Sequence, residues 1–104
     1  MCLAIYAATN EFPDSERFGL TTELRKTARS VVCNIAEGHR RRSPADFARF
    51  LDIARGSQAE VDTQLILSME LGYLDERTFQ RLMTLSDDTG ALIYNLTLAI
   101  RRSR

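Results

Sequence analysis

The sequence predicts an all-α fold, an antiparallel up-down four-helix bundle with a shortened first helix. Three observations support this fold class. Apolar residues recur at the helical period over long segments, Gly and Pro mark the breaks between the segments, and no alternating run bounded by turn residues indicates a strand. The length of 104 residues suits one domain, residues 1–104.

The two N-terminal helices are predicted to be the shorter pair. The first covers residues 1–10 and the second covers residues 21–37. Gly38 suits the left-handed residue that often follows a helix. An apolar stripe of helical period runs along the second helix and consists of Leu20, Leu24, Ala28, Val31 and Ile35.

The third predicted helix, residues 44–71, has the clearest start signal. Ser43 is an N-cap residue, Pro44 fits the first helical position, and Asp46 lies near the positive end of the helix dipole. Gly56 interrupts the helical pattern, and either a close helix crossing or a local kink would explain it. The apolar face follows a heptad spacing through Phe47, Leu51, Ala54, Gln58, Val61, Leu65 and Ser68.

The fourth predicted helix starts after Asp75, a residue type that caps helices, and continues to about Arg101. At 1.5 Å per residue the four helices would be roughly 15, 25, 42 and 39 Å long. The two short helices therefore cannot cover the two long ones. An uncovered apolar stripe predicts self-association or a missing piece of helix.

The chain is neutral overall, with 14 basic and 14 acidic side chains, but its charges are unevenly distributed. Residues 25–55 hold eight basic and three acidic side chains, a net charge of +5, and residues 101–104 add three arginines. In an up-down bundle, the connector between the second and third helices lies at the same end as the C-terminus. We define the basic pole as the arginines expected there, Arg40, Arg41, Arg42, Arg101 and Arg102, with Arg104 following them.

The basic pole predicts binding to RNA or DNA, because arginine forms bidentate contacts with phosphate. Arg25 and Arg29, four residues apart on the second helix, could extend this surface along the bundle. The alternatives are that the pole only complements helix dipoles, and that Arg25 and Arg29 pair with carboxylates of the third helix or of a second subunit. The predicted nucleic-acid-binding residues are Arg25, Arg29, Arg40, Arg41, Arg42, Arg101 and Arg102.

The sequence lacks the motifs of catalytic and cofactor sites. His39 is the only histidine, and it shares no metal-ligand spacing with a carboxylate or a cysteine. No phosphate-binding glycine loop, dinucleotide fingerprint or nucleophile elbow occurs. We therefore predict a non-enzymatic protein with no catalytic residue, no metal and no cofactor. Polar residues near the apolar stripes predict a structural network that fixes the register of the second and third helices. A catalytic carboxylate among them is the alternative. The network residues are Asn34, Glu37, Ser57 and Glu60.

The chain is predicted to lie in the cytoplasm and not in a membrane. Its longest apolar runs are far shorter than the roughly 20 residues that a transmembrane helix needs. Cys2 and Cys33 are distant in sequence and form no Cys-x-x-Cys pair. Free buried thiols in a reducing compartment fit this spacing, and a disulfide between the two cysteines is the alternative.

Two motifs together are specific, Asn34-Ile35-Ala36-Glu37-Gly38 and Gly56-Ser57-x-x-Glu60, and the stretch Phe12-Pro13-x-x-Glu16-Arg17-Phe18-Gly19 accompanies them. On these motifs the chain resembles the bacterial four-helix-bundle proteins, also called the 23S rRNA-intervening-sequence protein family. The resemblance extends from Ile5 to Leu74. Members usually have more of the first helix, whereas four residues precede Ile5 here. We expect either a misassigned start or the loss of half of this helix.

The resemblance implies a small cytosolic helical bundle that tends to form homopentamers. Some members are encoded within intervening sequences of ribosomal RNA genes, and a related accessory protein of diversity-generating retroelements binds nucleic acid and a reverse transcriptase. No catalytic residue comes with the resemblance. The prediction is therefore an oligomeric protein that binds RNA or DNA, and the alternative is an oligomeric adaptor for a protein partner with no nucleic-acid role.

Overall fold

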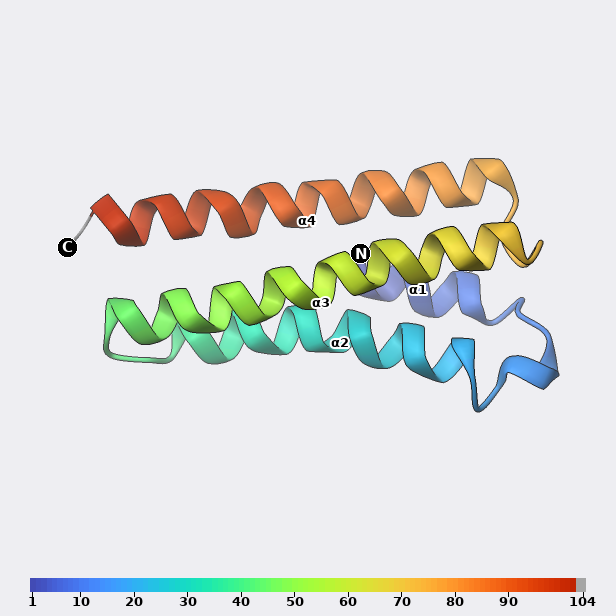
Figure 1. The fold of residues 1–104 in the computed structure, drawn as a ribbon, viewed down its shortest axis with the longest axis horizontal. Helices are drawn as coiled ribbons and strands as arrows, with labels where there is room; N and C mark the ends of the chain where they lie inside the picture. Colours follow the sequence, from blue (N-terminus) through green and yellow to red (C-terminus); the bar gives the residue numbers. More distant parts are fainter. Residues whose placement is uncertain (103–104) are drawn as a thin grey trace.

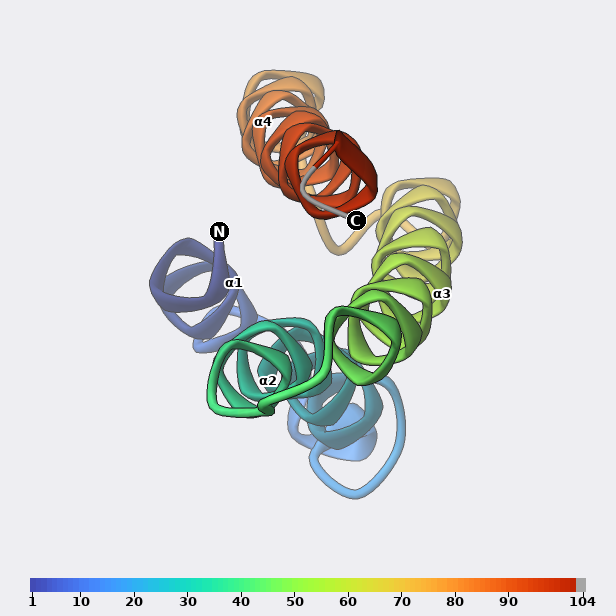
Figure 2. The same ribbon diagram turned by 90° about the vertical axis from the view of Figure 1, so that its left-hand side faces the viewer.

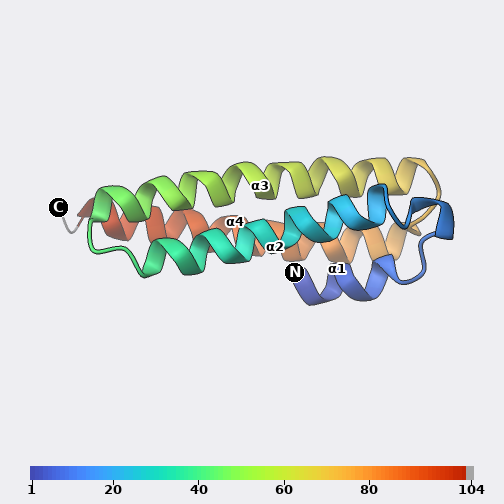
Figure 3. The same cartoon turned by 90° about the horizontal axis from the view of Figure 1, so that it is seen from below.

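The computed structural model describes residues 1–102, in which four helices are joined by short connectors (Figure 1). Consecutive helices run in opposite directions, and this part of the chain contains no strand (Figure 3). The predicted all-α up-down bundle is confirmed, and the first helix is the short one. The elements are α1 (Cys2–Thr9), a 3-10 turn (Asp14–Glu16), α2 (Leu20–His39), α3 (Pro44–Glu70) and α4 (Glu76–Arg102).

The hydrophobic core lies among the four helices, and α3 packs against both of its neighbours. Viewed end-on, the four helices surround this core (Figure 2). The heptad positions predicted for α3 are buried from Leu51 onward, while Phe47 is half-buried. The largest fully buried apolar side chains come from all four helices: Ile5, Leu24, Val31, Leu51, Val61, Leu65, Leu82 and Ile93.

The two long helices begin at the caps that the sequence indicates. The backbone N–H of Asp46 donates a hydrogen bond to the Ser43 hydroxyl oxygen at 3.3 Å, and Pro44 opens α3. The backbone N–H of Thr78 donates to a carboxylate oxygen of Asp75 at 2.7 Å. This hydrogen bond lowers the pKa of the Asp75 carboxyl group, because it stabilises the charged form. These caps place the helix starts where they were predicted.

The glycines differ from their predicted roles. Gly38 lies inside α2 with a negative φ, because the helix continues to His39. A Cβ atom added at Gly38 would lie 2.8 Å from Cβ of Phe50 and 2.9 Å from a ring carbon of Phe47, so the close approach of α2 and α3 occurs here. A Cβ atom added at Gly56 would meet nothing within 4 Å, so the predicted close crossing at Gly56 is wrong.

The left-handed residue is Gly72, with φ +81°, and it ends α3. Its backbone N–H donates to the carbonyl oxygen of Met69, and the N–H of Tyr73 donates to the carbonyl oxygen of Ser68, both at 2.9 Å. This pair of hydrogen bonds is the Schellman arrangement, which satisfies the last carbonyl groups of a helix.

Helix α1 covers only the half of the bundle that faces the α3–α4 connector (Figures 1 and 3). Beyond its N-terminus a groove of about 400 Å³ lies between α2 and α4, which we call the α2–α4 groove. Val32 and Leu92, on opposite sides of the groove, are about half exposed. The uncovered apolar stripe predicted from the helix lengths is therefore confirmed. The groove is lined by Met1, Cys2, Val32, Ile35, Ala36, His39, Thr89 and Leu92.

Cys2 and Cys33 are free thiols, as the sequence predicted, but the prediction that they are buried is wrong. Cys2 is partly exposed, and Cys33 is exposed because it lies outside the apolar stripe of α2. Among residues 1–102, no helix combines the length and apolarity needed to cross a bilayer.

Candidate nucleic-acid interface

The basic pole lies at one end of the bundle. The α2–α3 connector, which carries Arg40, Arg41 and Arg42, and the C-terminal turn of α4, which carries Arg101 and Arg102, lie at the same end (Figure 1). All five side chains are exposed. Antiparallel topology thus brings together two basic segments that are about 60 positions apart in the sequence. Arg104 lies outside the described residues.

Arg41 is the member of the pole that already has partners. Its guanidinium group forms an ion pair with Glu37 at 2.6 Å and lies 4.8 Å from the centre of the Phe50 ring. Arg49 lies over the same ring, also at 4.8 Å. The side chains of the remaining four arginines of the pole form no hydrogen bond or ion pair within residues 1–102, so their guanidinium groups can contact a phosphate without breaking an existing contact.

The basic pole also places positive charge at the negative ends of two helix dipoles. Arg40 follows the C-terminus of α2, and Arg101 and Arg102 lie in the last turn of α4, where cations are favoured. The start of α3 lies at the same end and contributes a partial positive charge, capped by Ser43. The field at this end is therefore set by guanidinium groups and one helix N-terminus, opposed by two helix C-termini.

Arg25 and Arg29 both contact the N-terminal helix α1, and Arg25 also contacts the residue that follows it. Arg25 donates to the Thr9 hydroxyl oxygen at 2.7 Å and to the Asn10 side-chain oxygen at 2.9 Å, and its guanidinium group lies 4.8 Å from the centre of the Tyr6 ring. Arg29 donates to the Tyr6 hydroxyl group, and this hydrogen bond raises the pKa of Arg29. Both arginines therefore attach α1 to α2 and do not pair with carboxylates of α3.

The predicted polar network forms only in part. The hydroxyl oxygens of Ser30 and Ser57 are 2.8 Å apart, which links α2 to α3, and Asn34 donates to the Ser30 carbonyl oxygen at 2.8 Å. Glu37 pairs with Arg41 instead, and Glu60 is exposed. The prediction was therefore wrong for these two glutamates, which form no hydrogen bond or ion pair between α2 and α3 in the described part of the chain.

A second polar network, between α3 and α4, was missed. The amide of Gln58 donates to the Ser86 carbonyl oxygen at 2.9 Å, and the Ser86 hydroxyl group donates to a carboxylate oxygen of Asp62 at 2.5 Å. A Cβ atom at Gly90 would lie 2.6 Å from the Gln58 amide nitrogen, so the glycine makes room for this side chain. The signal for this network in the sequence was Gln58, a polar residue at an otherwise apolar heptad position of α3.

Two residues near the basic pole were also missed, Arg55 on α3 and Tyr94 on α4. They line two neighbouring hollows of about 280 and 320 Å³ between these helices. Arg101 of the basic pole lines the smaller hollow. Nothing in the sequence joins Arg55 to Tyr94, because the two residues meet only when α3 and α4 pack.

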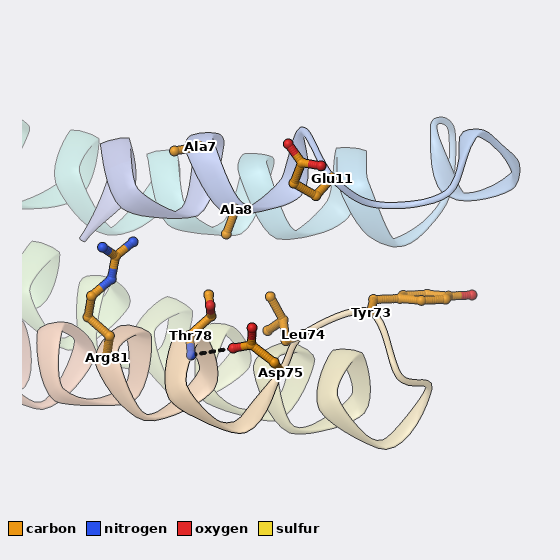
Figure 4. Close-up of a pocket in the computed structure, with 8 residues that line it drawn as sticks. All are labelled: Ala7, Ala8, Glu11, Tyr73, Leu74, Asp75, Thr78 and Arg81. Carbon is orange, nitrogen blue, oxygen red and sulfur yellow. Dashed lines mark hydrogen bonds between the residues drawn. The ribbon is translucent and has the colours of Figure 1, made fainter.

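A separate pocket of about 280 Å³ lies at the opposite end of the bundle, between α1 and the start of α4 (Figure 4). Its charged lining consists of Glu11, Asp75 and Arg81. The Tyr73 hydroxyl group points away from it and donates to a carboxylate oxygen of Glu16 at 2.8 Å, which raises the pKa of Tyr73. This pocket carries more negative than positive charge and does not suit a polyanion.

The described residues contain no group of three His, Cys, Asp or Glu side chains that could hold a metal ion. A protein-family model described as 23S rRNA-intervening sequence protein matches residues 1–95 of the chain. A search of curated proteins returned no match. The match ends within α4, so Arg101 and Arg102 lie beyond it.

Proposed function

The chain belongs to the 23S rRNA-intervening sequence protein family, and on this premise we propose that it is a non-enzymatic cytoplasmic protein that binds RNA or DNA through its basic pole. The observation that carries the proposal is the grouping of Arg40, Arg42, Arg101 and Arg102 at one end of a neutral chain, with no ion-pair partner among residues 1–102. Phosphate groups are the partners that such guanidinium groups fit best.

The pole fits contact with the nucleic-acid backbone rather than with bases in a groove. Its arginines lie on a connector and at a helix end, and no helix presents them as a continuous reading surface. Phosphate contacts carry little sequence information and release counterions. We therefore expect weak sequence preference and a steep dependence of affinity on salt.

The test removes two unpaired arginines from the pole. Arg40→Ala/Arg42→Ala is expected to weaken binding at least about tenfold and to reduce the slope of log K against log salt by about 1.4 for single strands or 1.8 for duplexes. The matched control is Arg77→Ala/Arg81→Ala, which removes two exposed arginines from the other half of α4. Fluorescence anisotropy between about 50 and 200 mM salt measures both quantities. Equal binding by the two variants, or no binding by the wild type, would refute the proposal.

We also propose that the protein is a homo-oligomer in which a second copy covers the α2–α4 groove. This apolar groove continues from the free end of α1, a helix that carries exposed Leu3 and is apolar on almost every side. Helices with this character are normally buried on all sides. The homopentamer implied by the family resemblance stays a prediction.

Self-association is tested with two leucines of equal exposure. Leu92, in the groove, is 51% exposed, and Leu67, on α3 outside the groove, is 49% exposed. Leu92→Asp is expected to yield monomers, whereas Leu67→Asp keeps the mass of the wild-type oligomer. Sedimentation velocity at micromolar concentration gives the masses. A monomeric wild type contradicts the oligomer, and dissociation by Leu67→Asp alone contradicts the assignment of the groove.

The alternative function is an oligomeric adaptor that binds a protein partner, such as a reverse transcriptase, and no nucleic acid. An intact oligomer that binds neither RNA nor DNA at low salt would favour it.

A further inference from the structure

Tyr94 is an aromatic side chain without an internal role in the described chain. It lies on α4 beside the hollows between α3 and α4 and is 54% exposed. The other two tyrosines are engaged, since Tyr6 lies under Arg25 and Tyr73 packs on Phe12 with ring centres 5.4 Å apart. Within residues 1–102, the Tyr94 side chain forms no hydrogen bond or ring contact. Both its ring and its hydroxyl group are therefore available to a ligand.

The surroundings of Tyr94 suit a short stretch of a nucleic-acid strand. Tyr94 and Arg55 together separate two open hollows between α3 and α4, of about 280 and 320 Å³. Arg101 lines the smaller hollow, and it lies seven positions after Tyr94, about 10 Å along the helix. A strand whose phosphates contact the basic pole can therefore continue along α4 to the ring of Tyr94.

The chemistry of this face favours unpaired bases. Asp52 and Asp87 also line the hollows, so the two arginines are balanced by two carboxylates and charge alone attracts a strand weakly. An exposed aromatic ring supplies the missing affinity by stacking, and every base has a face to stack on it. In a duplex the neighbouring base pairs already cover these faces, so only a single strand can use the ring.

We propose that Tyr94, flanked by Arg55 and Arg101, is a stacking site for a base of single-stranded RNA or DNA. This proposal rests on the proposed function, because it extends the phosphate contacts of the basic pole into a site that selects single strands over duplexes. Two of the other cavities fit this ligand less well, since the α2–α4 groove is apolar and the pocket beside Glu11 and Asp75 is acidic.

The experiment compares Tyr94→Leu with Tyr94→Phe, using a labelled oligonucleotide of about 20 nucleotides as a single strand and as a duplex. Tyr94→Leu should lower single-strand affinity roughly 5- to 140-fold, because base–aromatic stacking contributes on that scale, and should leave duplex affinity nearly unchanged. Tyr94→Phe keeps the ring and should bind like the wild type. Phe18→Leu, which removes another exposed ring at the opposite end of the bundle, is the matched control and should change neither affinity.

A second measurement does not depend on loss of binding. The chain contains no Trp, so Tyr94→Trp places the only tryptophan at the site, and its emission can be excited selectively over that of the remaining tyrosines. Its emission should be quenched by the single strand and not by the duplex. Three results would overturn the stacking site. Tyr94→Leu could bind the single strand as well as the wild type does, or it could lose equal affinity for the single strand and the duplex. The third is that the single strand does not quench the emission of Tyr94→Trp. If Arg40→Ala/Arg42→Ala still weakens binding in that case, the proposed function stands; if the wild type binds neither probe, the proposed function itself fails.

Discussion

Leu65→Ala is expected to lower the free energy of unfolding by about 2–5 kcal/mol, because it leaves a cavity in a region that cannot collapse. Leu65 is fully buried in α3, the helix that packs against both α2 and α4. A loss of this size is a large fraction of the roughly 5–15 kcal/mol that stabilises a typical domain. We therefore expect partial unfolding of the variant at physiological temperature.

Leu67→Ala provides the control for this prediction, because Leu67 belongs to the same helix and is half exposed. Its truncation should cost less than about 1 kcal/mol, since most of its apolar surface already faces water. Urea unfolding followed by circular dichroism, at one fixed protein concentration, measures both variants, because self-association would make stability depend on concentration. Equal losses would show that α3 does not bury the face assigned to the core.

Gly38→Ala and Gly56→Ala are expected to change stability in opposite directions. The new methyl group at Gly38 would lie 2.8 Å from Cβ of Phe50 and 3.3 Å from the carbonyl oxygen of Phe47, so α2 and α3 must separate. Overpacking of this kind costs about 1–3 kcal/mol, which exceeds the roughly 1 kcal/mol that alanine gains over glycine in a helix. At Gly56 the methyl group meets nothing within 4 Å, so only the gain of about 0.5–1 kcal/mol remains.

Thermal unfolding of the two variants against the wild type checks these signs. A shift to lower temperature is expected for Gly38→Ala and a shift to higher temperature for Gly56→Ala. Separation of the helices at Gly38 should also displace the α2–α3 connector, and with it Arg40 and Arg42. Stabilisation by Gly38→Ala would mean that Phe47 and Phe50 move aside at little cost, which would remove the argument for a close approach.

The limits of the helices followed from local chemistry, which is why the sequence predicted them to within about two residues. Ser43 and Asp75 accept hydrogen bonds from backbone groups three residues away, and such bonds need only neighbours in sequence. The sequence also predicted that the first two helices are shorter than the last two, since the length of a helix follows from the number of its residues. The α2–α4 groove is the structural consequence of that count.

The roles of individual arginines could not be predicted in the same way. Arg25 and Arg40 are the same residue type on or beside α2, yet the side chain of Arg25 holds α1 through Thr9 and Asn10, whereas the side chain of Arg40 forms no hydrogen bond or ion pair among residues 1–102. The difference depends on which half of α2 the short α1 covers. The position of α1 on α2 is a property of helix packing, and no periodic pattern in the sequence reports it.

The sequence by itself determined the helix limits and the resemblance to the family, because caps, apolar period and motifs are local properties. It also determined the up-down order of the helices and the meeting of two basic segments at one end, because both follow from chain direction. Only the tertiary structure decided that Gly38 and not Gly56 lies at the α2–α3 crossing, that Arg25 and Arg29 are used internally, and that Tyr94 lies beside Arg55. Each of these depends on the rotation of one helix against another. That rotation is set by the packing of side chains that are distant in sequence.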